Sequence, residues 1–147
     1  MYYYSICITL DENAPSIKPD PDTKHDFNHH SSRMEFARRI SCLMRIHCSS
    51  WGVNRMPVFN IFSTTTALLA LLADLSDPQN RDAFVHLAVV AKAFARRWVL
   101  GQKKLEQVQA QAQWMGIKLP DETEPLFSSL ESLTDESLSS RKRVKLK

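Results

Sequence analysis

Between Asp77 and Trp98 the apolar side chains recur every three or four residues, which predicts one helix with a wide buried face. The face consists of Phe84, Leu87, Ala88, Ala91, Phe94, Ala95 and Trp98, widened by Val85, Val89 and Val90. Asp77 can cap the helix, and Pro78 suits its first position, where a missing N–H costs nothing. Arg96-Arg97 place cations where the helix dipole favours them. We therefore expect this helix inside a helical assembly.

The two segments before this helix also predict helices. The first runs from about Arg33 to Ser50 and ends at Trp51-Gly52; its apolar side holds Phe36, Ile40, Leu43 and Met44. The second opens at Pro57 and runs to Ala73, and it is apolar on nearly every side except at Ser63–Thr66, so it should be central. We expect those hydroxyls to bond to carbonyls one turn earlier. A polar lining for a small-molecule effector pocket is the alternative.

A last amphipathic helix is predicted from about Gln102 to Met115, after a bend that Gly101 permits. Its inward positions are Leu105, Val108, Ala112 and Met115. Gly116 is a natural residue just past a helix end, because glycine adopts the left-handed conformation needed there.

The N-terminal region gives a weaker pattern. The aromatic and β-branched composition of Met1–Leu10 favours a strand by propensity alone. Because the chain starts directly inside an apolar segment, we expect that an upstream portion is missing. Residues 11–32 contain three prolines, several aspartates and no apolar periodicity, so we expect a disordered linker.

These patterns predict an all-α fold, an irregular bundle of about four to five helices with a disordered N-terminal linker and C-terminal tail. A chain of 147 residues allows one domain with a real core, and three glycines argue against a turn-rich β fold. We place the helical domain at residues 33–119.

From residue 120 to 140 the chain alternates acidic and apolar residues, a composition typical of partner-binding segments. Phe127, Leu130 and Leu133 recur at three-residue spacing within it. One interpretation is an activation motif that occupies the groove of a coactivator. The other is that this stretch covers the core of its own domain. The sequence leaves both open.

The last seven residues carry the positive charge of the chain. They hold five of the nineteen Lys and Arg and no Asp or Glu, which leaves residues 1–140 with a net charge of −2. The body is therefore not a nucleic-acid surface by charge. The five basic residues are candidates for a nuclear import signal that binds an import carrier: Arg141, Lys142, Arg143, Lys145 and Lys147. A solubilising or phosphate-binding tail is the alternative.

The remaining chemistry is sparse. Three cysteines form no disulfide framework, which fits a reducing compartment, and we expect Cys42 and Cys48 to be small hydrophobic residues of the core. No zinc-binding spacing joins these cysteines to the histidines at positions 25, 29, 30 and 47, so we expect no metal. No signal peptide or membrane span is evident, and no nucleophile or acid–base pair suggests an enzyme.

Five short motifs, placed in order along these helices, together form a recognisable pattern. They are Ala37–Ser41, Trp51–Pro57, Asp77–Phe84, Arg96–Trp98 and Met115–Pro120. With them the chain resembles the C-terminal half of the fungal-specific transcription factor domain, the all-helical middle region of zinc-cluster regulators, and is most similar to the nitrogen-assimilation type. The resemblance covers Phe36–Phe127 well and Met1–Leu10 weakly.

The resemblance implies a nuclear, non-enzymatic part of a regulator of RNA polymerase II transcription, in contact with coactivators or other regulator subunits. In that family an N-terminal cluster of six cysteines binds two zinc ions and docks a helix on DNA. This chain has no such cluster, so we expect no cofactor here, DNA contact only through a missing N-terminal module, and no membrane contact. The resemblance also favours a helix for residues 2–10 and an internal truncation at Met1. A generic helical interaction module, or a small ligand-binding helical protein, is the alternative.

Overall fold

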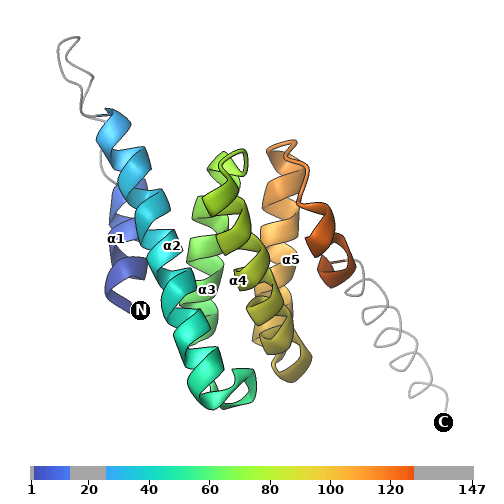
Figure 1. Cartoon of the computed structure of the whole chain (residues 1–147). Coiled ribbons are helices and arrows are strands. Elements are labelled where there is room, and N and C mark those ends of the chain that lie inside the picture. Colours follow the sequence, from blue (N-terminus) through green and yellow to red (C-terminus); the bar gives the residue numbers. More distant parts are fainter. Residues whose placement is uncertain (1, 14–25, 128–147) are drawn as a thin grey trace.

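A computed structural model describes residues 2–13 and 26–127, with the backbone alone for residues 2, 11–13 and 26–30 (Figure 1). The described residues form α-helices and short 3-10 turns and no strand, which confirms the all-α class. The elements are α1 (Tyr2–Asn13), α2 (Asp26–Trp51), η1 (Val53–Arg55), α3 (Asn60–Leu71), η2 (Leu72–Asp74), α4 (Pro78–Arg97), α5 (Val99–Trp114) and η3 (Asp121–Thr123).

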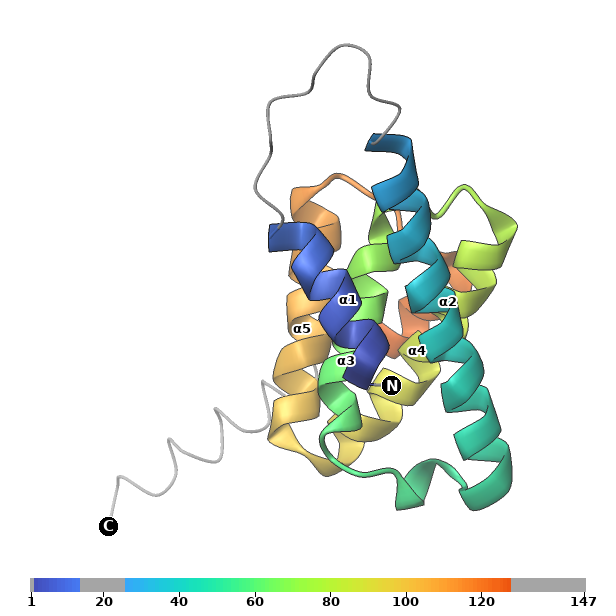
Figure 2. The same ribbon diagram turned by 90° about the vertical axis from the view of Figure 1, so that its left-hand side faces the viewer.

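Consecutive helices run in alternating directions, as Figures 1 and 2 show together. Helix α3 occupies the centre, because it contacts α1, α2, α4 and α5. Nine of its twelve residues are buried. The central position expected for this segment is therefore confirmed, although its helix begins at Asn60. Pro57 instead opens a turn, in which its carbonyl accepts a hydrogen bond from the Asn60 N–H at 3.1 Å.

The N-terminal segment forms helix α1, as the family resemblance implies, and not the strand that propensity favours. One face of α1 packs on α2 and α3, where Ile8 is fully buried and Tyr4 stacks on Phe36 with ring centroids 5.8 Å apart. Packing against neighbours thus decides the conformation of residues whose intrinsic preference is β.

Helix α2 begins at Asp26, seven residues before the predicted start, so the expected linker of residues 11–32 is helical at both ends. Residues 14–25 lie outside the described residues. Since no proline or glycine occurs from residue 22 to 51, nothing interrupts the helix, and an apolar stripe is needed only where α2 packs. Met34, Ala37, Ile40 and Met44 form that buried stripe.

Helix α4 confirms the capping pattern predicted from sequence. The Asp77 carboxylate accepts a hydrogen bond from the Gln79 N–H at 2.8 Å, and Pro78 occupies the first turn. Val90 is buried with the predicted apolar face. Val89 is 49% exposed, however, so the face is narrower than predicted.

The corner between α4 and α5 lies at Trp98, whose extended backbone (φ −133°, ψ 130°) separates the two helices. Gly101, predicted to permit this bend, instead lies inside α5, where its backbone approaches that of Phe94 closely. A Cβ on Gly101 would stand 2.6 Å from the Phe94 carbonyl carbon, so a larger residue would not fit.

The end of α5 is a Schellman motif, as the position of Gly116 predicts. Gly116 has φ 66°, and its N–H donates to the Gln113 carbonyl at 3.1 Å. The Ile117 N–H donates to the Ala112 carbonyl at 2.9 Å. This turn directs residues 117–127 back along the bundle, where η3 contacts α4.

Candidate protein-interaction surface

Phe127, the first of the three apolar residues predicted to bind a coactivator, is 3% exposed and belongs to the core. Beside it, the buried Lys92 ammonium on α4 donates to the Leu126 carbonyl at 2.8 Å. In this conformation Phe127 covers the core of its own domain, which is the second of the two interpretations that the sequence leaves open for this stretch. Leu130 and Leu133 lie outside the described residues, as do the basic residues of the predicted import signal at positions 141–147.

The cysteines and histidines do not assemble a metal site within residues 2–13 and 26–127, where no group of three potential ligands occurs. Cys42 is exposed, so its expected place in the core is wrong; it lies on the outer side of α2. Cys48 packs against the core, and burial raises the pKa of its thiol, which favours the unreactive protonated form. His47 lies against the Trp51 ring, with centroids 4.9 Å apart. His25 lies outside the described residues.

The hydroxyl run in α3 has the default role expected for it. Thr64 and Thr65 donate to the carbonyls of Asn60 and Ile61, each at 2.8 Å. The crevice that both threonines line, between α3, α4 and α5, has a volume of about 10 Å³, which is room for one water molecule. The alternative of an effector pocket at these threonines has no space to support it.

A larger open groove of about 480 Å³ lies between α5 and the segment after Gly116, and Gln109, Ile117 and Phe127 help to line it. The Lys118 ammonium pairs with the Asp121 carboxylate at 3.0 Å. This ion pair lowers the pKa of Asp121 and raises that of Lys118. Both groups therefore stay charged near neutral pH, so neither is poised to transfer a proton.

The motifs that carry the family resemblance meet one another in space. Arg38 on α2 reaches the start of α4, where it bonds to the Asp77 carboxylate at 3.2 Å and to the Asn80 amide oxygen at 3.1 Å. Asn80 in turn donates to the Asp74 carbonyl at 3.0 Å. One guanidinium thus joins the cap of α4 to α2.

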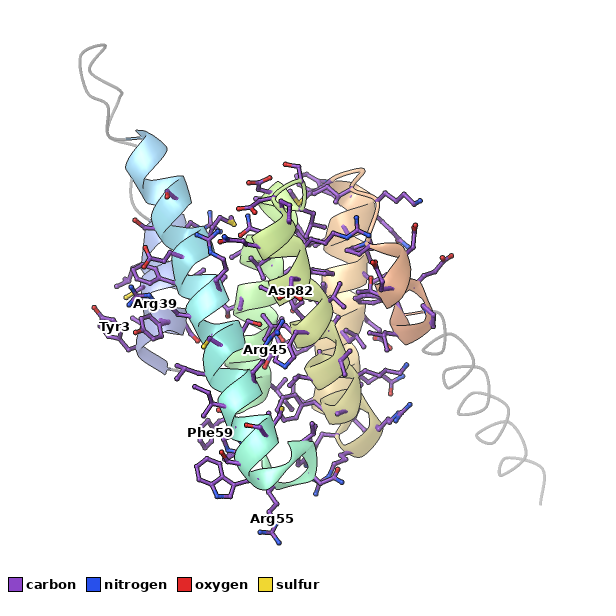
Figure 3. All side chains as sticks on the ribbon, in the orientation of Figure 1. Tyr3, Arg39, Arg45, Arg55, Phe59 and Asp82 are labelled. Carbon is purple, nitrogen blue, oxygen red and sulfur yellow. The ribbon has the colours of Figure 1, made fainter. Side chains whose placement is uncertain are left out.

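The same α2–α4 seam continues one turn further. The Ser41 hydroxyl lies 3.0 Å from His86 Nδ1, and Arg45 pairs with Asp82 at 2.6 Å; Figure 3 labels this last pair. His86 is half-buried. Burial lowers its pKa, and the charge of Arg45 lowers it further, so the neutral ring is favoured. A second pair of motifs meets where the Arg97 guanidinium donates to the Asn54 carbonyl. These contacts, from motif residues and their neighbours, therefore hold the helices against one another.

Exposed apolar side chains gather at one end of the bundle, which we call the η1 end. It comprises the C-terminus of α2, η1, the start of α3 and the corner between α4 and α5, all at the lower end in Figures 1 and 2. Figure 3 labels Phe59 and Arg55 there. The exposed apolar residues of this end are Trp51 (59%), Val58 (44%), Phe59 (44%), Phe62 (48%), Val99 (71%) and Leu100 (36%).

The η1 end is also positively charged. Residues 46–73 and 83–105, which include every element of this end, contain no Asp or Glu. Its basic residues are Arg55, Arg96, Arg97, Lys103 and Lys104. The Lys104 ammonium lies 5.9 Å from the centroid of the exposed Phe62 ring, so a positive charge lies directly beside apolar surface there. Exposed apolar side chains together with basic residues at one end of the bundle make a candidate protein-interaction surface.

Sequence reasoning missed this surface because it joins two stretches that are far apart along the chain, one from the end of α2 to the start of α3 and the other at the corner between α4 and α5. The usable signal was the absence of acidic residues from two long stretches, which becomes meaningful only once both stretches share one end.

Within the described residues, no helix is both long and apolar enough to cross a membrane.

Comparison with known proteins gives one informative relative. Over 97 residues, which are 66% of this chain and 16% of the other protein, the chain is 38% identical to the notoamide biosynthesis transcriptional activator NotL' of Aspergillus versicolor. The chain therefore corresponds to a small part of that activator's length. No family model and no solved structure matches the chain.

Proposed function

We propose that this chain is part of the regulatory region of a fungal RNA polymerase II transcription regulator and acts in the nucleus through protein–protein contacts. The observation that carries the proposal is its 38% identity with NotL', a protein named as a transcriptional activator. Because the match covers 16% of that activator, DNA binding and the choice of target genes would belong to other parts of such a regulator.

The finer assignment is the C-terminal half of the fungal-specific transcription factor domain of zinc-cluster regulators, of the nitrogen-assimilation type. The contacts between motifs support it, because Arg38–Asp77 and Arg97–Asn54 each join two of the short sequences that carry the resemblance. The η1 end supports action through protein contacts, because its apolar side chains would gain from being covered by a partner.

A tethering experiment tests the proposal. The full chain is fused to an unrelated DNA-binding domain, and transcription of a reporter is measured in a filamentous fungus. We expect reporter transcription to change, and the change to disappear in a Trp51→Ser, Phe59→Ser variant, since both residues lie in the exposed patch. A matched control is Trp114→Ser, because Trp114 is 83% exposed on α5 and lies near its other end. A parent fusion that accumulates but leaves the reporter unchanged would contradict the proposal.

Nuclear import is tested separately, with the full chain fused to a fluorescent protein. We expect nuclear accumulation that is lost when Arg141, Lys142 and Arg143 are replaced by alanine. Replacement of Lys103 and Lys104, two adjacent basic residues in α5, is the control and should leave localisation unchanged. A diffuse parent fusion would reject the import signal and favour the second candidate, a generic helical interaction module, which the exposed η1 end also supports.

A further inference from the structure

The η1 end lacks an acidic counterpart of its own. Its five basic residues come from the same elements as its exposed aromatic rings, the Lys104 ammonium lies over the Phe62 ring, and residues 46–73 and 83–105 contain no carboxylate. A complementary occupant would be acidic and apolar at once, because it must cover the rings and also balance the charges. Nucleic acid fits less well, since phosphates would leave Val58, Phe59 and Val99 facing water.

The chain itself contains a segment of this composition. Residues 128–140 include Leu130, Leu133 and Leu138 among three acidic residues and no basic one. The acidic residues are Glu131, Asp135 and Glu136. At Arg141 the charge reverses, and repulsion from the η1 end would limit docking to the residues before it.

The described chain ends within reach of the η1 end. Leu126 is bonded to Lys92, which lies five residues before the end of α4 at Arg97, or about 7.5 Å along the helix axis. Arg96 is one turn from Lys92, near enough for its charge to lower the pKa of that lysine. Thirteen residues span about 20 Å as a helix and about 43 Å when extended. Length therefore does not prevent residues 128–140 from covering this end.

We propose that residues 128–140 dock on the η1 end of the same chain, with their leucines against Phe59 and Phe62 and their carboxylates beside Arg97, Lys103 and Lys104. This proposal goes beyond the proposed function and does not depend on it, because it concerns contacts within one molecule. Its consequence is that the acidic segment and an outside partner compete for the same surface.

Zero-length carbodiimide cross-linking of the full chain tests the contact, because it forms an amide without a spacer and so joins a lysine to a carboxylate only where the two groups come into direct contact. We expect Lys103 or Lys104 to be joined to Glu131, Asp135 or Glu136. The Lys118–Asp121 pair, at 3.0 Å, is the internal control for the reaction. An equal mixture of light and heavy isotope-labelled chains identifies links between copies.

The outcomes are distinct. Links found in light–light and heavy–heavy pairs alone, without mixed pairs, support the proposal. Mixed-isotope links would overturn it in favour of docking between two copies. A Lys118–Asp121 link without any link from the η1 end to residues 128–140 would also overturn it, and would leave the surface free for another protein.

Hydrogen exchange of the full chain gives a second readout. In a Glu131→Lys, Asp135→Lys, Glu136→Lys variant, amides of residues 51–62 should exchange roughly two- to fivefold faster, the ratio expected when exposed ion pairs are lost. Glu124→Lys, an exposed change before the segment, is the matched control. Equal exchange in the triple variant and the wild type would contradict docking.

Discussion

The Lys92 ammonium donates a hydrogen bond to the carbonyl oxygen of Leu126, 2.8 Å away, and so fastens the last described residues to α4. Lys92 is only 6% exposed. Burial lowers its pKa, and the neighbouring charge of Arg96 lowers it further. Because a buried cation needs acceptors, the carbonyl compensates for water that the ammonium has lost. The contact also keeps Phe127 in the core.

Removing this contact should loosen the C-terminal end of the domain. In Lys92→Met the apolar stem remains but the Leu126 carbonyl loses its donor, so we expect a loss of about 1–3 kcal/mol in the free energy of unfolding. Urea unfolding measures the loss, and hydrogen exchange should quicken at residues 121–127. Lys103→Met, an exposed change on α5, should stay within about 0.5 kcal/mol. Equal losses in the two variants would contradict the assigned role.

The helix cap at Asp77 should contribute more to the free energy of unfolding than the ion pair between Asp77 and Arg38. Asp77→Ala removes the acceptor for the Gln79 N–H and should cost about 1 kcal/mol. The Arg38 and Asp77 side chains are 31% and 35% exposed, so a double-mutant cycle should give a coupling below about 1 kcal/mol. Gln79→Ala is the neighbouring control. An Arg38–Asp77 coupling energy larger than the loss caused by removing the cap would contradict this prediction.

Opposite substitutions in α5 should both destabilise the protein. Gly101→Ala raises helix propensity by about 1 kcal/mol but drives a Cβ into the Phe94 backbone, so we expect a net loss of about 1–3 kcal/mol. Ala110→Gly, at an exposed position of the same helix, should lose about 1 kcal/mol through propensity alone. Thermal unfolding of both variants measures this. A stabilised Gly101→Ala would mean that α4 and α5 are further apart.

The His86 ring should make stability depend on pH. Its pKa in the folded chain lies below the unfolded value, so the unfolded state binds the proton more tightly. The stabilisation is therefore present above about pH 6.5 and is lost as the pH falls through the unfolded pKa toward the folded one. We expect the difference in unfolding free energy between wild type and His86→Gln to shrink over this interval. A difference independent of pH would contradict burial of the neutral ring.

Local chemistry made some features predictable from sequence. Asp77-Pro78 specifies a helix start through one side chain and one ring, and Gly116 specifies a helix end through its φ of 66°. Neither needs knowledge of a distant neighbour. The all-α class was predictable for a similar reason, because apolar residues spaced every three or four positions indicate a helix within each segment alone.

Features that depend on neighbours were not predictable in this way. The sequence predicts a bend at Gly101. In the structure Gly101 instead lies against the backbone of Phe94, which belongs to another helix. The sequence leaves open whether Phe127 binds a partner or covers its own domain, and only the packing of the helices places its ring in the core. The η1 end likewise exists only because the fold brings the α2–α3 connection beside the corner between α4 and α5. Propensity and spacing contain none of this information.

The Arg38–Asp77 contact has a consequence for recognising distant relatives. The two residues are 39 positions apart, yet they share one hydrogen bond and one cap. When a relative loses Arg38, the Asp77 carboxylate loses one of its two hydrogen-bond roles and is less constrained, so the two positions should change together during evolution. Correlated replacement at this pair, and not similarity at either site alone, would then be the mark of a shared ancestor.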